Sequence, residues 1–409
     1  MTKIAVIGAG ITGVTTAYEL SRKGFEVTVF DRNRYAAMET SYANGGQLSV
    51  SNAEVWTRWK TILKGLKWMM RRDAPLLVNP KPEWRKIKWM TAFMGNIPDY
   101  RANTVETVRL ALQARNVLFE TAEREGIDFD HVERGILHVY EDDGELAHGR
   151  FVSEMLAEGG LERREVSVGE AREIEPALGG NLVGAIYTES DSTGDIHKFT
   201  MGLAKACARN GVEMHFGETI EAGTQTAANV RLTTNKGEYE FDAVVLCAGV
   251  HSPDIAHMLG EAVNIYPVKG YSITVDLPDE ESRAAAPWVS ILDDKAKIVA
   301  SRLGDNRFRV AGTAEFNGYS RDIRADRVKP LVDWCERLFP NMSTETCVPW
   351  AGLRPMTPSM LPKVGKGKRD RVFFNTGHGH LGWTLSAATA GMVATEVAEV
   401  HGQGMQGVS

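Results

Sequence analysis

The chain has 409 residues, of which 43% are hydrophobic and 24% charged, and its formal net charge is −6. These are globular proportions with room for two or three domains, and the acidic balance predicts no general attraction to nucleic acid. The cysteines, Cys207, Cys247, Cys335 and Cys347, include no C-x-x-C pair, which argues against a disulfide framework, a zinc site or an iron–sulfur cluster and favours a reducing compartment.

The start of the chain predicts no targeting segment. The apolar run at residues 3–7 is too short for a signal peptide and has no small-residue cleavage site after it. No stretch of the sequence is long and apolar enough to span a bilayer. We therefore expect a cytoplasmic protein, or one attached to the cytoplasmic face of the inner membrane.

The most informative motif follows at once. Residues 4–7 predict a buried parallel strand, and a G-x-G-x-x-G turn and a helix lead to a second strand, 26–30, that ends in an acid. The glycines allow a tight turn and close approach to a pyrophosphate, which the helix N-terminus binds. A glycine-rich turn of another α/β protein is the alternative, but the flanking strands favour a dinucleotide site. Its expected contacts are Gly8, Gly10, Ile11, Thr12, Gly13, Asp31 and Arg32.

The segments after the second strand favour FAD over a nicotinamide cofactor. A nicotinamide dehydrogenase would continue with further βα units, whereas residues 33–49 have the composition of a loop. Strand patterns that could complete the first sheet return only at 241–249 and 371–375. A nucleotide domain interrupted in this way is typical of flavoproteins that bind FAD in an extended form.

A second glycine motif, at residues 377–382, precedes a predicted helix over 384–400. It could indicate a nicotinamide site, but the chain ends one helix later, so no second βαβ unit can close. We expect this helix N-terminus to lie at the flavin ring, where its dipole would stabilise negative charge that develops during reduction.

Together these segments resemble the small-subunit type of D-amino acid dehydrogenases, within the glycine oxidase and D-amino acid oxidase group. The motifs that carry the resemblance are the N-terminal fingerprint and residues 39–47, 193–195, 269–272, 352–358 and 375–384. They span nearly the whole chain in the family's order.

The resemblance implies an α/β fold with an FAD-binding Rossmann-like domain of the glutathione-reductase type, assembled from residues 1–52, 195–265 and 345–409. Residues 53–194 and 266–344 are expected to form a mixed α+β substrate domain with a largely antiparallel sheet. Strand candidates for that sheet are 135–140, 184–188, 268–276, 297–302 and 307–312.

FAD is expected to bind non-covalently. Besides the fingerprint, the expected contacts are Ser41, Asn44, Gly45, Gly46, Gln47, Ala248, Gly249, Gly377, His378, Gly379, Leu381, Gly382 and Thr384.

On the substrate side, the resemblance makes Arg354 the candidate anchor for a carboxylate, because a guanidinium offers a planar bidentate fit. The alternative is an ion pair between the two domains. Tyr271 is expected to contact the substrate or cover the flavin, with plain packing as the alternative. His380 is expected to line the pocket and His378 to shape the turn, and no metal partners stand at ligand spacing. We expect no obligatory side-chain base, because the cofactor accepts the hydride at flavin N5 and the protein mainly orients the substrate.

One position departs from the family. Where the family usually has Asp-Gly after residues 352–358, this chain has Ser359 and Met360, which bears on hydrogen bonding near the flavin and on substrate preference.

A basic, tryptophan-rich segment covers residues 55–90, with ten Lys or Arg, two acids and five of the nine tryptophans of the chain. Apolar and basic residues recur there at helical spacing, which predicts either a helix on the membrane surface or a helix buried against the substrate domain. The helix is expected to contain Trp56, Trp59, Lys60, Leu63, Lys64, Leu66, Lys67, Met70 and Arg71.

The leading functional hypothesis is oxidation of D-amino acids to 2-oxo acids and ammonia, with electrons passed to a quinone-type acceptor. D-hydroxyproline dehydrogenase and a glycine or sarcosine-type oxidase that uses O₂ are the close alternatives. A non-catalytic FAD-carrying subunit of an electron-transfer complex is the alternative from another class.

Overall fold

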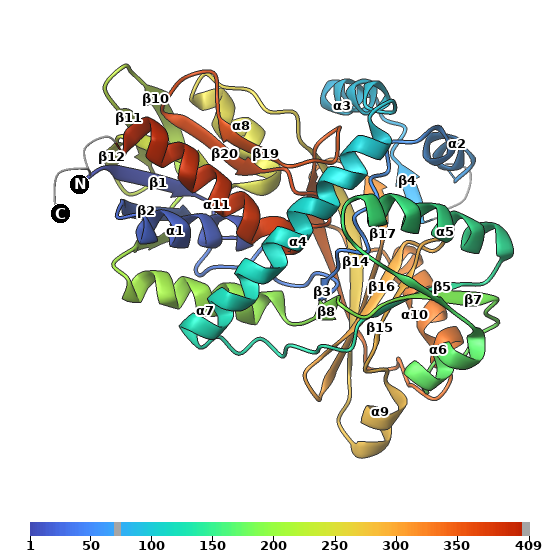
Figure 1. Ribbon diagram of the computed structural model, residues 1–409. Helices are drawn as coiled ribbons and strands as arrows, with labels where there is room; N and C mark the ends of the chain where they lie inside the picture. The colour runs from blue at the N-terminus through green and yellow to red at the C-terminus, as the bar shows by residue number, and fades with distance from the viewer. Residues whose placement is uncertain (69–74, 403–409) are drawn as a thin grey trace.

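The computed structural model describes residues 1–68 and 75–402. Two sheets organise this part of the chain (Figure 1). The first has the order β19-β20-β13-β1-β2-β9, and its strands are Lys363–Lys366, Val372–Thr376, Ala243–Leu246, Lys3–Ile7, Glu26–Asp31 and Glu213–Phe216. All of its pairings are parallel except that of β19 with β20.

Both faces of the first sheet are covered, as its continuous apolar strands predict. Ile4 and Val6 of β1 pack with the helices α1 (Ile11–Arg22), α7 (Ile196–Arg209) and α11 (Gly382–His401). Ala5 and Ile7 face the other way, onto a three-stranded sheet and the helix α8. These elements are β10 (Ile220–Gln225), β11 (Val230–Thr234), β12 (Glu238–Phe241) and α8 (Ser252–Met258).

The second sheet has the order β18-β14-β17-β16-β15-β5-β7-β6, and β4 pairs with β17. Its strands are Val348–Met356, Tyr266–Asp276, Arg307–Phe316, Ile298–Leu303, Ser290–Asp293, Ile136–Tyr140, Gly184–Thr188, Arg164–Val166 and Leu76–Val78. Most pairings are antiparallel, and all five strand candidates for this sheet are present. The helix α10 (Ala325–Leu338) packs against one face through Leu331 and Trp334.

The remaining elements connect or cover the two sheets. They are β3 (Gln47–Leu48), β8 (Ser192–Thr193), α2 (Trp59–Trp68), α3 (Trp84–Gly95), α4 (Tyr100–Glu125), α5 (Asp143–Glu158), α6 (Val168–Ile174), α9 (Glu280–Ala285) and the 3₁₀ helix η1 (Gly249–His251).

The structure corrects two of the predicted boundaries. Residues 345–356 were assigned to the nucleotide domain, but β18 pairs with β14 along its whole length and belongs to the second sheet. The first sheet resumes only at β19. The long helix α4 was assigned to the substrate domain, yet Ala114, Leu118 and Ala122 pack in the same core as α1 and α11.

Asp195 links the two halves at the start of α7. One carboxylate oxygen accepts the N–H groups of His197 and Lys198 at 2.8 and 3.2 Å, and the other accepts the guanidinium of Arg307 on β17 at 2.8 Å. Burial raises the pKa of Asp195, but the bonds from Arg307 and the Lys198 N–H outweigh burial and hold that pKa below its usual range. The carboxylate thus caps a helix and ties it to the second sheet.

We predict that Asp195→Ala lowers the free energy of unfolding by about 2–3 kcal/mol, because a helix cap and a charge-assisted hydrogen bond are lost together. Urea unfolding at pH 7 measures the loss. Asp279→Ala, which removes the exposed N-cap of α9, is the control and should cost less. Since the pKa of Asp195 is lowered in the folded state, the difference between wild type and Asp195→Ala should shrink as the pH falls below about 4.

Candidate functional site

A cavity of about 460 Å³ lies where the edge of the first sheet meets the open face of the second. The walls come from both fingerprint motifs, the 39–49 loop, η1 and the strands β14, β16, β17 and β18. Of the predicted site residues, those that line it are Gly8, Gly10, Ile11, Thr12, Asp31, Arg32, Ser41, Asn44, Gly45, Gln47, Ala248, Gly249, Tyr271, Arg354, Gly377, His378, Gly379, His380 and Gly382. Gly13, Gly46, Leu381 and Thr384 are not among its lining residues.

The N-terminal turn has the geometry that a dinucleotide requires. Gly8 adopts a φ of +108°, and a Cβ there would lie 2.6 Å from the carbonyl oxygen of Cys247. A Cβ at Gly13 would overlap the carbonyl of Gly8, so this glycine serves close packing of α1 on the sheet and not ligand contact. Gly10, the N-cap of α1, provides no side-chain cap for the N–H groups at the helix start.

Asp31 is the last residue of β2 and lies at the rim of the cavity. Its carboxylate accepts the N–H of Ala9 at 2.7 Å and two bonds from Asn33 at 2.8 and 2.9 Å. Burial raises the pKa of Asp31 despite these bonds. Its carboxylate is therefore held in place by the turn itself, in a position where it borders the cavity.

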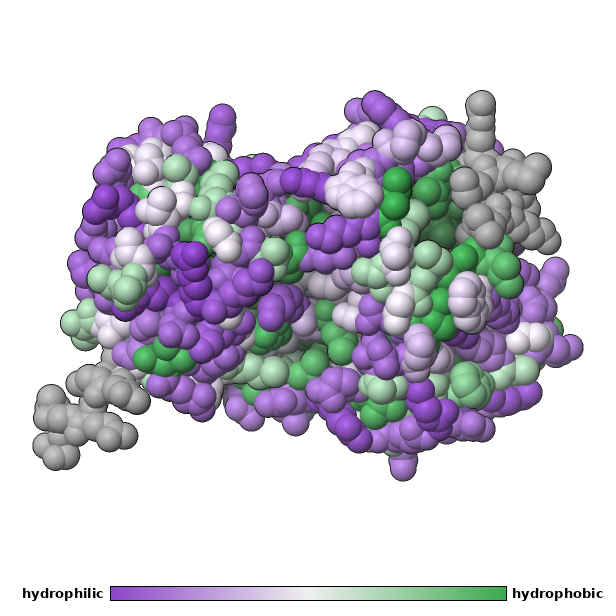
Figure 2. All heavy atoms as spheres, turned by 90° about the horizontal axis from the view of Figure 1, so that it is seen from above, coloured by the Kyte–Doolittle hydropathy of each residue, from purple (hydrophilic) through white to green (hydrophobic). Residues whose placement is uncertain are grey.

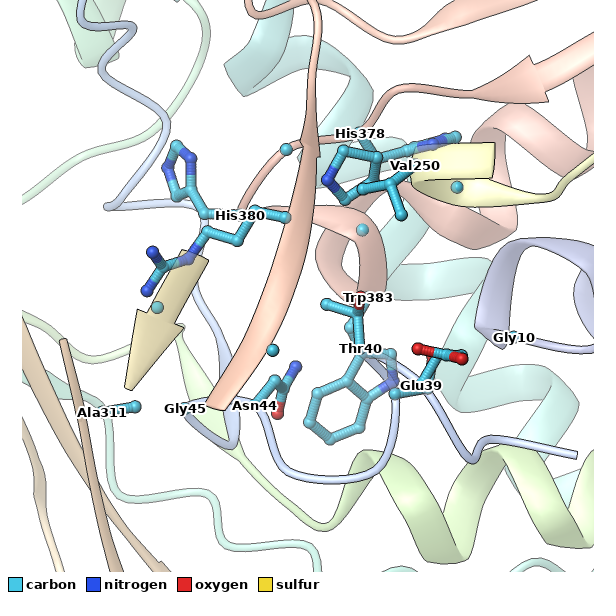
Figure 3. Close-up of a pocket in the computed structure, with 18 of the residues that line it drawn as sticks. Gly10, Glu39, Thr40, Asn44, Gly45, Val250, Ala311, His378, His380 and Trp383 are labelled. Atoms are coloured by element: carbon cyan, nitrogen blue, oxygen red, sulfur yellow. The ribbon is translucent and has the colours of Figure 1, made fainter. Parts of the chain in front are cut away.

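The 39–47 loop lies across the cavity from the C-terminal segment. Ser41 accepts the N–H of Ile11 at 3.0 Å, and Thr40 donates to the carbonyl of Leu353 at 2.8 Å, so the loop joins the fingerprint helix to β18. Figure 3 shows Glu39, Thr40, Asn44 and Gly45 on this loop with the Trp383 indole beside them, while His378 and His380 lie across from the loop.

Glu39 carries an interaction that the sequence did not reveal. Its carboxylate pairs with Arg32 at 2.6 Å and with Arg321, which lies between β17 and α10. Burial raises its pKa, but the two guanidinium groups outweigh burial and lower it overall. The pairs join the nucleotide turn to the second half of the molecule beside the cavity.

The C-terminal glycine motif forms the turn before α11. Gly377 and Gly379 have φ values of +81° and +58°, which favour glycine. His378 points inward, with Nε2 3.0 Å from the Thr389 hydroxyl, and burial lowers its pKa to about 3. The histidine is therefore neutral and fixes the turn to the helix that follows.

Arg354 lies on the cavity face of the second sheet, on a surface made by glycines. Gly270 of β14 and Gly352 of β18 are opposite each other, and a Cβ at Gly270 would overlap the Arg354 guanidinium. A Cβ at Gly352 would overlap the indole of Trp350. The two glycines let the guanidinium and the indole lie flat along the strands.

Among the residues that the structure describes, the Arg354 guanidinium has one hydrogen-bond partner, the carbonyl of Thr313, which accepts from Nη1 at 2.8 Å. Within residues 1–68 and 75–402, no carboxylate lies within ion-pair distance of it. Burial lowers the pKa of Arg354 to about 10, so the group remains charged at neutral pH. A desolvated cation without a counter-ion on the wall of a cavity is suited to bind an anion. The alternative prediction was that Arg354 forms an ion pair between the two domains; among the described residues its partner is instead a backbone carbonyl.

Tyr271 borders the cavity, but its ring packs away from it. It alternates with Gly270 and Ser272 on β14, so its ring lies on the opposite face, in the core with Leu331 and Trp334. Its hydroxyl donates to Glu315 at 2.9 Å. The phenol therefore packs away from Arg354, and the alternative of plain packing describes it.

His380 and Trp56 form another wall. Their rings stack with centroids 5.1 Å apart, and His380 Nε2 lies 3.3 Å from the carbonyl of Asn52. Burial, with the nearby charges of Arg354 and Lys297, lowers the pKa of His380 to about 4, so it is neutral beside the arginine. Trp56 was predicted to be part of a surface helix, but α2 begins at Trp59 and Trp56 lines the cavity.

The departure at 359–360 has a clear local geometry. Met360 has a φ of +65°, the left-handed conformation that the family's usual glycine adopts at no cost. Its side chain is buried with Trp89 and Tyr266, and its sulfur accepts the N–H of Trp56. This methionine thus supports the wall formed by Trp56 and His380.

The residues present fit an FAD. Besides the two glycine turns and the Asp31 carboxylate, several buried polar atoms of the lining lack a partner among the described residues, including Gln47 Oε1 and Trp383 Nε1. Buried polar groups are normally hydrogen-bonded, so a polar cofactor would satisfy them. Among the same residues, no group of three or more His, Cys, Asp or Glu is arranged to hold a metal ion.

Sequence reasoning missed Thr313, Trp350, Trp383 and the Glu39–Arg321 pair. Trp383 alone had a signal, because it follows the second glycine motif and starts a helix. The others depend on strand pairing or on a loop distant in the sequence.

Comparison with known proteins agrees with this architecture. Residues 3–396 match the family described as FAD dependent oxidoreductase. The chain is 60% identical to D-amino acid dehydrogenase 3 of Mesorhizobium japonicum over 401 residues, covering 97% of each, and 43% identical to D-amino acid dehydrogenase of Paramagnetospirillum magneticum, covering 96% of this chain and 94% of that one. Glycine oxidase from Geobacillus kaustophilus shares the fold with a TM-score of 0.75 at 21% identity, over 98% of this chain and 95% of the other.

The neutral histidines lead to a prediction about pH. The folded-state pKa values of about 3 for His378 and about 4 for His380 lie below the unfolded value of about 6.5, so unfolding takes up protons between these values. The histidines therefore contribute stability that is present above about pH 6.5 and is lost as the pH falls. Each contributes at most about 1.4 kcal/mol per pH unit.

We expect His380→Gln to flatten the fall of unfolding free energy between pH 6.5 and 4.5, as measured by urea titrations across that range. His257→Gln, at an exposed position on α8, tests whether any loss of a histidine has this effect. A wild-type slope in His380→Gln would contradict the neutral assignment.

Proposed function

Because the chain belongs to the family of FAD-dependent oxidoreductases, we propose that it oxidises D-amino acids to 2-oxo acids and ammonia and passes the electrons to a quinone-type acceptor. The proposal is supported by full-length similarity to two D-amino acid dehydrogenases. The structural observation that carries it is the unpaired Arg354 guanidinium on the wall of the cavity.

Arg354, Gly270 and Thr313 have different roles in binding the substrate. The Arg354 guanidinium binds the α-carboxylate of the substrate, and Gly270 leaves the room for it to do so. The Thr313 carbonyl holds the guanidinium in one orientation. With the carboxylate held at Arg354, the shape of the cavity places the remaining groups on the α-carbon.

Bound FAD supplies the acceptor for the two electrons and the hydrogen that leave the α-carbon. The amine must be neutral to donate its electron pair to the new C=N bond, and the positive field of Arg354 favours loss of its proton. His380 is neutral and therefore adds no second positive charge beside Arg354. Trp56 stacks on the His380 ring and limits the access of water to this wall. Water then adds to the imino acid and releases ammonia, which requires no base from the protein.

We also propose that α2 and α3 rest on an anionic membrane surface, where a lipid-soluble quinone is available. Apolar side chains on these helices are exposed: Trp59 by 62%, Leu63 by 64% and Trp84 by 76%. Lys60 and Lys88 are exposed beside them. Figure 2 shows hydrophobic atoms gathered on this side of the molecule. An apolar surface bordered by cations is complementary to anionic lipid.

Part of the predicted membrane segment lies outside the residues that the structure describes. Met70 and Arg71 are outside the described residues, as are the side chains of Lys64, Leu66 and Lys67. Among the described residues, no helix combines the length and the apolar character needed to cross a bilayer.

The activity is tested with the FAD-loaded enzyme mixed anaerobically with D-alanine, L-alanine, glycine and D-hydroxyproline. We expect D-alanine to bleach the flavin absorbance and a quinone analogue to restore it faster than air does. Arg354→Gln should raise the D-alanine concentration for half-maximal bleaching by about 100-fold or more, because a charge-assisted pair is lost. Bleaching by glycine with rapid reoxidation by air would instead indicate an oxidase, and no bleaching would reject the substrate class.

Membrane contact is tested by sedimentation with vesicles that contain anionic phospholipid. We predict binding at low salt that falls at high salt, and loss of binding in Trp59→Glu and Trp84→Glu. Val348→Glu is the control, because Val348 is 59% exposed but lies at the start of β18 and not on either helix. Equal retention of all variants would reject this surface.

A further inference from the structure

Thr313 occupies an irregular position in the second sheet, directly beside Arg354. The pairing of β14 with β17 shifts between Lys269 and Tyr271, which are opposite Glu315 and Gly312. Two residues of β17, Thr313 and Ala314, therefore stand opposite the single residue Gly270. This is a β-bulge, a feature that redirects side chains and occurs often beside active sites.

The backbone at the bulge is unusual for this residue type. Thr313 has a φ of +57°, which a β-branched side chain rarely adopts. The conformation is strained and persists only where the surroundings require it. Glycine would adopt it freely, so the fold alone gives no reason for a threonine.

The bulge determines where the polar groups of Thr313 point. Its carbonyl accepts Nη1 of Arg354 at 2.8 Å. Gly270, over which the guanidinium lies, is the residue opposite, so Thr313 and the guanidinium are neighbours on the cavity face. The strand pair next to the bulge, Lys269 and Glu315, is joined by a buried ion pair in which Nζ and Oε1 lie 3.4 Å apart.

The hydroxyl of Thr313 has no partner among the described residues although only 3% of the residue is exposed. An unsatisfied buried hydroxyl destabilises the folded protein. Thr313 lines the cavity, so a ligand can provide the missing partner. Arg354 has no acceptor atom, and a ligand carboxylate bound to it has acceptor sites beyond the two that a guanidinium occupies.

We propose that Thr313 is a substrate-binding residue whose hydroxyl donates to the carboxylate held by Arg354. This inference rests on the proposed role of Arg354. The bulge then has two effects: the carbonyl sets the orientation of the guanidinium, and the hydroxyl adds a third, neutral donor to the same anion. Strain in the free protein is retained because a glycine would lack that donor.

The test is a titration of the oxidised, FAD-loaded enzyme with pyruvate, a carboxylate that cannot reduce the flavin, followed by flavin absorbance. Thr313→Ala should raise the Kd for pyruvate and the KM for D-alanine about 10-fold or more, with kcat changed less than threefold. Thr313→Ser keeps the hydroxyl and should bind pyruvate within about threefold of wild type.

Thr313→Gly separates the hydroxyl from the fold. Glycine relieves the strain, so this variant should unfold at a higher urea concentration than wild type and still bind pyruvate as weakly as Thr313→Ala does. Wild-type affinity for pyruvate in both Thr313→Ala and Thr313→Gly would overturn the proposal. Arg354→Gln tests separately whether Arg354 binds the carboxylate. If this variant binds pyruvate with wild-type affinity, the carboxylate is bound elsewhere and the proposed role of Arg354 is wrong.

Discussion

A desolvated cation without a fixed counter-ion is the constraint around which one side of the cavity is arranged. Two glycines on adjacent strands give the Arg354 guanidinium a flat surface, and a bulge on a third strand turns a carbonyl toward it. Each of these features weakens a sheet when considered alone, since glycine packs poorly and a bulge interrupts the ladder. Their combination is understandable only as support for a charge that the protein leaves available to a ligand.

The histidines of the cavity wall add no positive charge to that of Arg354. His378 and His380 are desolvated and neutral, so they provide shape and hydrogen bonds without adding charge. Two carboxylates that line the cavity are held by protein groups: Asp31 by the Ala9 N–H and Asn33, and Glu39 by two arginines. We therefore expect an anionic group of the ligand at Arg354, and selection of the rest of the ligand by the shape of the cavity.

Local patterns were sufficient to predict much of this structure. The glycines of both turns, four strands of the first sheet and five of the second were recognisable because spacing and apolar runs are properties of short segments. The sheet that a strand joins is not such a property: residues 348–356 lie next to glycine-rich cofactor motifs in sequence, yet β18 finds its partner in β14. Tyr271 fell on the wrong face because its register depends on that partner. The bulge at Thr313 could not be predicted, since it exists only in the pairing of β14 with β17.

The order of strands in the first sheet also determines when each strand can find its partner during translation. β1 lies between β2 and β13, and β13 in turn pairs with β20 at residues 372–376. At about 5–20 residues per second, a ribosome needs roughly 12–47 s to travel from the end of β1 to β13, the strand that covers the second edge of β1. Throughout that interval an apolar strand, complete at residue 7, waits without the neighbour that buries its second edge. Until β13 has been made, the nascent chain therefore exposes an unpaired strand edge, which is a template for aggregation.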